Sequence, residues 1–159
     1  MDTYIIAFGS NMGDSVHTLK EALAEMAKNP YLALRKVSSF YRTKPWGKTD
    51  QPDFINGALL AEWDRTPEEL MEFLLETEKK FGRVRKIHWG PRTLDLDIIY
   101  SKDHEIDTDF LHLPHPYFWA RPFVLVPLEE ILPEFSFKGE KIHDRIEELD
   151  GYKDLIKIE

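Results

Sequence analysis

Apolar residues gather in four stretches of the chain in the pattern of β-strands. The first stretch is rich in aromatic and β-branched residues, which favour a pleated sheet. The four stretches span residues 3–8, 31–43, 54–63 and 93–100. In the last stretch apolar and acidic residues alternate, so every second side chain is expected on the same face of the strand.

Two further stretches repeat apolar residues with a period near 3.6 and predict helices. The first, 14–28, begins at an Asp-Ser pair that can cap a helix and is stopped by Asn-Pro. The second, 66–82, begins Thr-Pro-Glu-Glu, which combines a cap, a proline at the first helical position and an acidic first turn. It ends at a glycine, and a short helical stretch is expected near 124–131.

The order β-α-β-β-α-β predicts an α+β, ferredoxin-like fold. Helices are expected on one face of an antiparallel sheet, which leaves the other face open for a ligand. No internal repeat or low-complexity linker divides the chain, so residues 1–159 are expected to form one domain. The loop at 44–53 is longer than a hairpin needs and is a candidate binding loop.

Composition narrows the range of partners. The chain has 21 Lys and Arg against 29 Asp and Glu, a net charge of −8, which argues against general binding to nucleic acid or anionic membranes. It has no cysteine, so disulfides and thiolate metal sites are excluded. The first residues lack the features of a signal peptide, and no apolar segment approaches the roughly 20 residues of a membrane span. We therefore expect a cytoplasmic monomer.

Candidate chemistry lies in the strand at 93–100. Asp95 and Asp97 are expected on one face, with Leu94, Leu96 and Ile98 on the other. Two neighbouring carboxylates repel each other unless a cation lies between them. Mg²⁺ prefers oxygen ligands and is commonly held by one or two carboxylates together with substrate phosphates.

The alternative is an edge strand with two solvated acids, the commoner fate of an isolated Asp-Leu-Asp. The preceding segment favours the metal site, because it is basic in an otherwise acidic chain. Its basic residues are Arg83, Arg85, Lys86, His88 and Arg92. Cations around a divalent metal site are what transfer from a polyphosphate requires. No Walker-type phosphate loop is present, so side chains and metal must hold a nucleotide.

Four segments follow one another along the chain: AFGSNMGD, SSFYRTKPWGKTDQPDFINGAL, GRVRKIHWGPRTLDLDIIY and LPHPYFWARPFVLVPL. Together they resemble the 6-hydroxymethyl-7,8-dihydropterin pyrophosphokinase family. The resemblance covers Ala7 to about Leu128. It implies transfer of the pyrophosphoryl group of ATP to the pterin hydroxymethyl oxygen with two Mg²⁺ ions, releasing AMP.

The resemblance also implies residue roles. Metal ligands would be Asp95 and Asp97, and the catalytic set would be Arg83, Arg92, Asp95 and Asp97. Residues that bind ATP would be Arg85, Trp89, Arg92, Ile98, His115 and Arg121. Residues that bind the pterin would be Thr43, Trp46, Phe54, Asn56, Asp95 and Phe123. Taken singly, the phenylalanines could be core residues, Asn56 an edge amide and His115 a loop histidine.

Two other functions remain open on the sequence. A two-metal phosphohydrolase would use the same aspartates but would need no stacking pocket for a pterin. A ferredoxin-like module that binds a ligand without turnover would explain the sheet and loops, but not paired aspartates beside several arginines.

Overall fold

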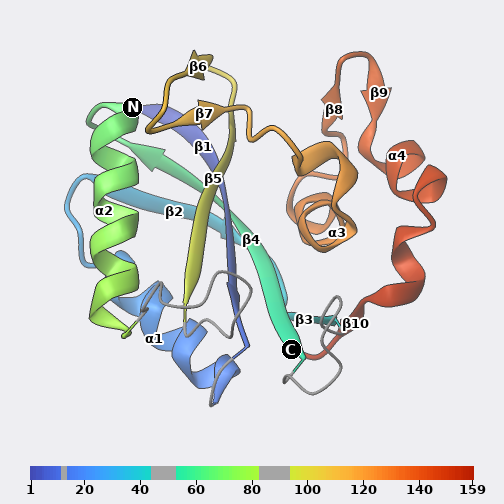
Figure 1. Ribbon diagram of the computed structural model, residues 1–159, viewed down its shortest axis with the longest axis horizontal. Coiled ribbons are helices and arrows are strands. Elements are labelled where there is room, and N and C mark those ends of the chain that lie inside the picture. Colours follow the sequence, from blue (N-terminus) through green and yellow to red (C-terminus); the bar gives the residue numbers. More distant parts are fainter. Residues whose placement is uncertain (12–13, 44–52, 83–93) are drawn as a thin grey trace.

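A six-stranded antiparallel sheet forms the centre of the protein (Figure 1). The computed structural model describes residues 1–11, 14–43, 53–82 and 94–159. The strands are β1 (Asp2–Ser10), β2 (Leu32–Val37), β3 (Tyr41–Thr43), β4 (Phe54–Trp63), β5 (Asp95–Ser101) and β10 (Ile156–Lys157). Their order is β10-β3-β4-β1-β5, and β2 pairs with β4 beyond β3. The predicted extended region 31–43 is therefore two strands, each paired with one half of β4.

Two amphipathic helices cover one face of the sheet, α1 (Ser15–Met26) and α2 (Pro67–Lys80). The side chain of Asp14 accepts a hydrogen bond from the backbone of His17 at the start of α1. Thr66 and Glu69 form a reciprocal capping box at the start of α2. Alternate apolar residues of β1, β4 and β5 pack beneath both helices in the first core cluster. The predicted α+β, ferredoxin-like fold is confirmed.

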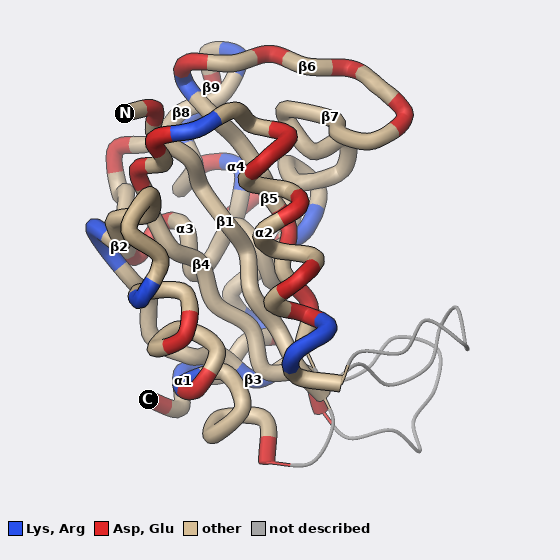
Figure 2. Tube along the Cα trace, turned by 90° about the vertical axis from the view of Figure 1, so that its left-hand side faces the viewer, with Lys and Arg blue, Asp and Glu red and all other residues tan. Residues whose placement is uncertain are grey.

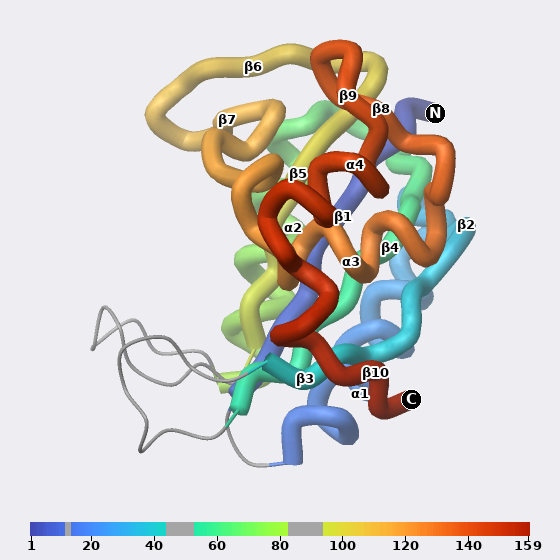
Figure 3. The backbone as a smooth tube through the Cα atoms, turned by 90° about the vertical axis from the view of Figure 1, so that its right-hand side faces the viewer, coloured from blue at the N-terminus to red at the C-terminus, as the bar shows by residue number. Residues whose placement is uncertain are grey.

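By the described residues, the opposite face is covered at one end only. Helices α3 (Pro122–Ile131) and α4 (Ile142–Glu148) lie on this side of the sheet (Figures 1 and 3). They pack over Ile5, Ala58 and Ile99 in a second core cluster. The open ligand face expected from the sequence is thus reduced to the other end, because apolar residues occupy both faces of the strands beneath α3.

Short elements complete the chain. They are the hairpins β6 (Ile106–Asp107) with β7 (His112–Leu113) and β8 (Ser136–Phe137) with β9 (Glu140–Lys141), and the 3-10 turns η1 (Phe118–Ala120) and η2 (Gly151–Asp154). From α4 the chain runs to β10, which pairs with β3 (Figure 3). Within the described ranges, no helix has the length and apolarity needed to cross a membrane.

Candidate active site

Two rows of residues cross three adjacent strands, one at the open end of the sheet and one at its border with the covered end. One row is Asn56, Gly9 and Asp95, and the next is Ala58, Ala7 and Asp97. Residues directly opposite one another in antiparallel strands share a face. Strands lie about 4.8 Å apart, so roughly 10 Å separate the backbones at the two ends of a row. Small residues thus form a floor between an amide and two carboxylates.

Gly9 allows the Asn56 side chain to lie across β1. A Cβ atom on Gly9 would stand 2.8 Å from Asn56 Oδ1. On the other side, Asn56 Nδ2 donates to Thr43 Oγ1 at 3.0 Å. The amide is therefore oriented, with its oxygen over Gly9 and its nitrogen toward β3. Such an amide can pair with a donor–acceptor edge of a flat heterocycle.

Asp95 and Asp97 lie half-buried on this face, as the alternation predicted. The residues between and around them enter the first core cluster, with Leu94 0%, Leu96 1% and Ile98 3% exposed. The side chain of Ile98 is therefore on the opposite face from the carboxylates. It has a packing role, and its expected contact with adenine stays a prediction.

His115 lies beside β5, because its backbone N–H donates to Ile99 O at 2.8 Å. Its Nδ1 accepts from the Tyr117 N–H at 3.3 Å, which leaves the ring proton on Nε2 in the neutral form. Burial lowers the pKa of His115, and the positive charge of Arg121 lowers it further, whereas Asp95 acts to raise it. Asp95 and Arg121 are thus both near enough to His115 to influence its charge.

Arg121 lies between two aromatic rings. Its guanidinium carbon is 5.5 Å from the centre of the Tyr117 ring and 5.7 Å from that of Phe123. Within the described part of the chain it makes no ion pair with a carboxylate. A stacked arginine of this kind keeps its donors available for an anion.

The aromatic residues expected to hold the pterin come from two elements. Phe54 begins β4 opposite Thr43 and is half-buried on the face that carries Asn56. Phe123 lies in the first turn of α3 and packs against the second core cluster. Both retain some exposed surface, so neither is a fully buried core residue.

Comparison with known proteins identifies the family. A model of the 7,8-dihydro-6-hydroxymethylpterin-pyrophosphokinase family matches residues 5–133. The chain belongs to this family.

Similar proteins include two that are named 2-amino-4-hydroxy-6-hydroxymethyldihydropteridine pyrophosphokinase. The protein from Synechocystis is 41% identical over 92% of this chain and 75% of its own length. The protein from Methylorubrum extorquens is 39% identical over 91% of this chain and 92% of its own length.

Solved structures support the fold. Crystal structures of Plasmodium falciparum HPPK-DHPS match with TM-scores of 0.72 for a triple mutant with STZ-DHP and 0.71 for the wild type, at 12% and 14% identity. The matches cover 99% of this chain but only 46% and 44% of those chains. This pyrophosphokinase-family chain therefore spans less than half the length of the crystallised proteins.

Five residues of the predicted site lie outside the described residues. They are Trp46 in the proline-containing loop, and Arg83, Arg85, Trp89 and Arg92 in the basic segment. Their roles stay predictions.

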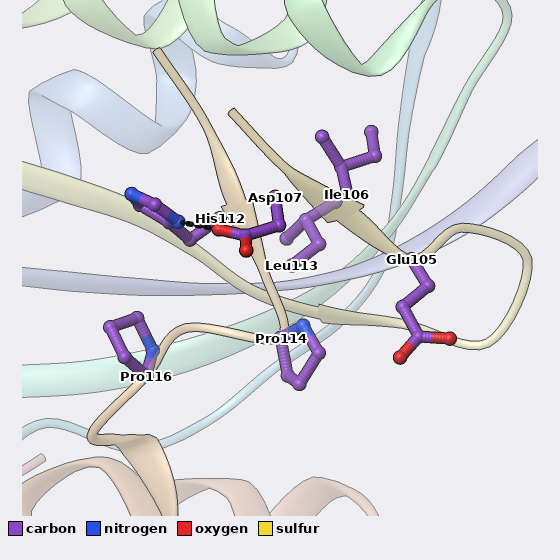
Figure 4. Close-up of a pocket in the computed structure, with 7 residues that line it drawn as sticks. All are labelled: Glu105, Ile106, Asp107, His112, Leu113, Pro114 and Pro116. Carbon is purple, nitrogen blue, oxygen red and sulfur yellow. Dashed lines mark hydrogen bonds and ion pairs between the residues drawn. The ribbon is translucent and has the colours of Figure 1, made fainter. Parts of the chain in front are cut away.

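A shallow pocket lies beside Pro114-His115-Pro116, the PHP segment, and was not predicted from the sequence (Figure 4). It has a volume of about 290 Å³ and is lined by Glu105, Ile106, Asp107, His112, Leu113, Pro114 and Pro116. His112 Nδ1 lies 2.7 Å from Asp107 Oδ1 at its rim. The two prolines that flank His115 indicate a constrained loop and were the only hint of this pocket in the sequence. The β6–β7 hairpin that completes the pocket could not be predicted, because strands of two residues have no recognisable alternation of apolar and polar residues.

Proposed function

We propose that this protein transfers the pyrophosphoryl group of ATP to the hydroxymethyl oxygen of 6-hydroxymethyl-7,8-dihydropterin. The products are AMP and the pterin diphosphate. The observation that carries the proposal is the row Asn56, Gly9 and Asp95, which spaces an oriented amide from a carboxylate pair across a flat floor. Membership of the pyrophosphokinase family supports this function over a two-metal phosphohydrolase and over a module that binds a ligand without turnover.

The pterin would lie on the small-residue floor. Its polar edge would pair with the Asn56 amide, whose nitrogen is already oriented by Thr43. Phe54 and Phe123 would contact the faces of the bicycle, since aromatic rings favour offset stacking. Trp46 and the backbone near it would complete the pocket. The hydroxymethyl group would then point toward Asp95.

The carboxylate pair fits Mg²⁺ by the chemistry of its donors. Asp95 and Asp97 present hard oxygen ligands on one face, two residues apart. Among the described residues no group of three or more His, Cys, Asp or Glu side chains could hold a metal ion. The two carboxylates would hold Mg²⁺ together with oxygen atoms of the triphosphate and of water. Bound Mg²⁺ offsets the negative charge on the β- and γ-phosphates.

The remaining side chains would bind and orient the triphosphate. Arg121 offers a guanidinium that no carboxylate of the described residues pairs with, and neutral His115 can donate from Nε2 to a phosphate oxygen. Arg83 and Arg92 would hold phosphate oxygens, while Arg85, Trp89 and Ile98 would contribute to the nucleotide site. The pocket formed by β6, β7 and the PHP segment provides a surface for the nucleoside.

The reaction is an in-line displacement at the β-phosphorus. The hydroxymethyl oxygen forms a bond to that phosphorus, and the bond from it to the α,β-bridging oxygen breaks. AMP leaves with the bridging oxygen, and the hydroxymethyl proton is released to solvent. The protein contributes mainly by fixing the two substrates at bonding distance and by charge stabilisation.

The decisive experiment measures AMP formation from ATP and Mg²⁺ with and without 6-hydroxymethyl-7,8-dihydropterin. We expect AMP only when both the pterin and Mg²⁺ are present, and ³¹P NMR should show a diphosphate ester of the pterin. Inorganic phosphate released regardless of pterin would favour the phosphohydrolase. Pterin binding without any turnover would favour the binding module.

The wider sequence expectations are part of the same proposal. A cytoplasmic monomer of one domain, without nucleic-acid or membrane partners, would suit an enzyme with two small substrates. Light scattering coupled to size-exclusion chromatography would test the monomer, and a mass near twice 18.7 kDa would contradict it.

A further inference from the structure

Glu78 differs from the other acidic residues of α2. Glu68, Glu69, Glu72 and Glu76 are exposed, and acidic residues line the outer side of this helix (Figure 2). Glu78 is only 2% exposed and is the single charged side chain among the buried residues of the described chain. A carboxylate buried beside an apolar core is costly unless hydrogen bonds satisfy it. Its retention at this position therefore calls for a specific partner.

One such partner is the backbone of β5. Glu78 Oε2 accepts a hydrogen bond from the Leu96 N–H at 2.8 Å. The nitrogen belongs to the peptide that joins Asp95 to Leu96, so the bond is made between the two site carboxylates. A bond to a carboxylate is among the stronger hydrogen bonds in proteins.

The place of β5 in the sheet explains why this amide needs a partner. Among the residues that the structure describes, β5 is the terminal strand and pairs only with β1. In an antiparallel pair every second residue turns its N–H away from the neighbouring strand. Leu96 does so at the sheet edge, where Glu78 takes the position that another strand would occupy.

We infer that Glu78 is a positioning residue for the carboxylate pair Asp95 and Asp97. It fixes the peptide plane between them and ties that plane to α2. The two carboxylates repel each other when no cation is bound, and an unsupported edge strand would twist in response. By holding Leu96, Glu78 keeps both side chains on the site face. The inference rests on the proposed function for its effect on Mg²⁺, but not for the hydrogen bond itself.

The test compares Glu78→Met with Glu78→Gln. Methionine has a similar length and removes the acceptor, whereas glutamine keeps an acceptor oxygen. Glu76→Met is the matched control, since it makes the same change at an exposed site two residues away. Leu70→Ala is a second control, because it destabilises the same helix from its buried face and leaves the Glu78 carboxylate in place.

The first readout uses metal-free, ¹⁵N-labelled protein. We expect the Leu96 amide to exchange slowly with solvent in the wild type and in Glu76→Met. In Glu78→Met it should exchange at least about tenfold faster, and Glu78→Gln should restore most of the protection. This readout does not depend on any enzymatic activity.

The second readout is the Mg²⁺ concentration that gives half-maximal AMP formation. Loss of a residue that orients metal ligands typically weakens metal affinity about 10- to 100-fold, and we expect a shift in this range for Glu78→Met. Glu78→Gln should lie within about threefold of the wild type. Leu70→Ala should lose stability without shifting the Mg²⁺ dependence.

The inference is overturned if Glu78→Met and Leu70→Ala shift the Mg²⁺ dependence alike, or if the wild-type Leu96 amide exchanges freely. Should Glu78→Met fail to fold, Glu78→Gln and the wild-type amide decide the question. A wild type that forms no AMP would refute the proposed function alone. Glu78 would then be tested by the amide and by Mg²⁺ titration of the Asp95 and Asp97 resonances, where an effect equal to that of Glu76→Met would overturn its role.

Discussion

The two ends of the second sheet face are built from the same strands but are opposite in character. At one end Ile5, Ala58 and Ile99 are buried beneath α3 and α4. At the other end Gly9, Asn56 and the aspartates form a shallow polar floor. The change occurs within two residues along β1, from Ile5 to Ala7. A single antiparallel scaffold thus holds a site rigidly, because the covered end fixes the strands that the open end uses.

A β-bulge marks the boundary between the two ends. Ile5 is opposite Tyr100 and Ile6 is opposite Ile98, so Ile99 is an extra residue on β5. Ile99 and the next residue, Tyr100, accordingly both pack in or against the second core cluster, whereas Ile98 enters the first. Bulges occur often next to active sites, where they redirect side chains. Here the bulge lies two residues beyond Asp97.

Asp97→Ala, at the open end, should have the largest effect on activity. We expect AMP formation to fall by about 10³-fold or more, because a group that supports charge on the reacting phosphates is lost. The fold should be retained, since the half-buried carboxylate lies outside both core clusters. Turnover assays and thermal unfolding would be measured together. The control is Asp144→Ala, because the Asp144 side chain in α4 is exposed. Near-normal turnover in Asp97→Ala would exclude the metal-ligand role.

Ile99→Ala should instead lower the stability of the covered end. Its side chain is 2% exposed in the second core cluster, and such truncations cost about 2–4 kcal/mol of unfolding free energy. The Mg²⁺ concentration that gives half-maximal AMP formation should not change in the protein that remains folded. Urea unfolding gives the stability, and assays well below the transition give the activity. A changed Mg²⁺ dependence with unaltered stability would show that the two ends are not separable in this way.

The sequence predicted the shared face of the two aspartates better than it predicted the helices that cover part of that face. Alternation in 93–100 placed Asp95 and Asp97 together, because one face of that strand is fully apolar up to Ile98. It did not reveal the bulge, since Ile98 and Ile99 are equally apolar and either face would accept them. Nor did it show that α3 would cover part of the second face. Glu78 was missed for a similar reason, because an acid in the last turns of an acidic helix resembles its exposed neighbours.

Gly9→Ala should separate pterin binding from ATP binding within the open end. The added Cβ would meet Asn56 Oδ1 at 2.8 Å and displace the amide. Loss of one oriented hydrogen bond is worth roughly 1–1.5 kcal/mol, so we expect the pterin KM to rise about tenfold while the ATP KM changes little.

A double-mutant cycle with Asn56→Ala tests the route of that effect. If Gly9 acts by making room for the Asn56 amide, the second substitution should add almost nothing to the first. Fully additive effects on the pterin KM would mean that Gly9 serves some other purpose, such as direct approach of the pterin to the backbone.

The smallest expected effect concerns His115, beside the open end. Burial and Arg121 hold its pKa below 6.5 in the folded protein, so the unfolded chain binds more protons between the two pKa values. Stability therefore rises with pH through this interval and is lost as the pH falls below about 6.5. His115→Gln should flatten this slope by less than one proton, measured by urea unfolding at several pH values. An NMR titration of the ring protons gives the direct check, and a midpoint at or above 6.5 in the ligand-free protein would contradict the neutral, Nε2-protonated histidine that we assign to the triphosphate site.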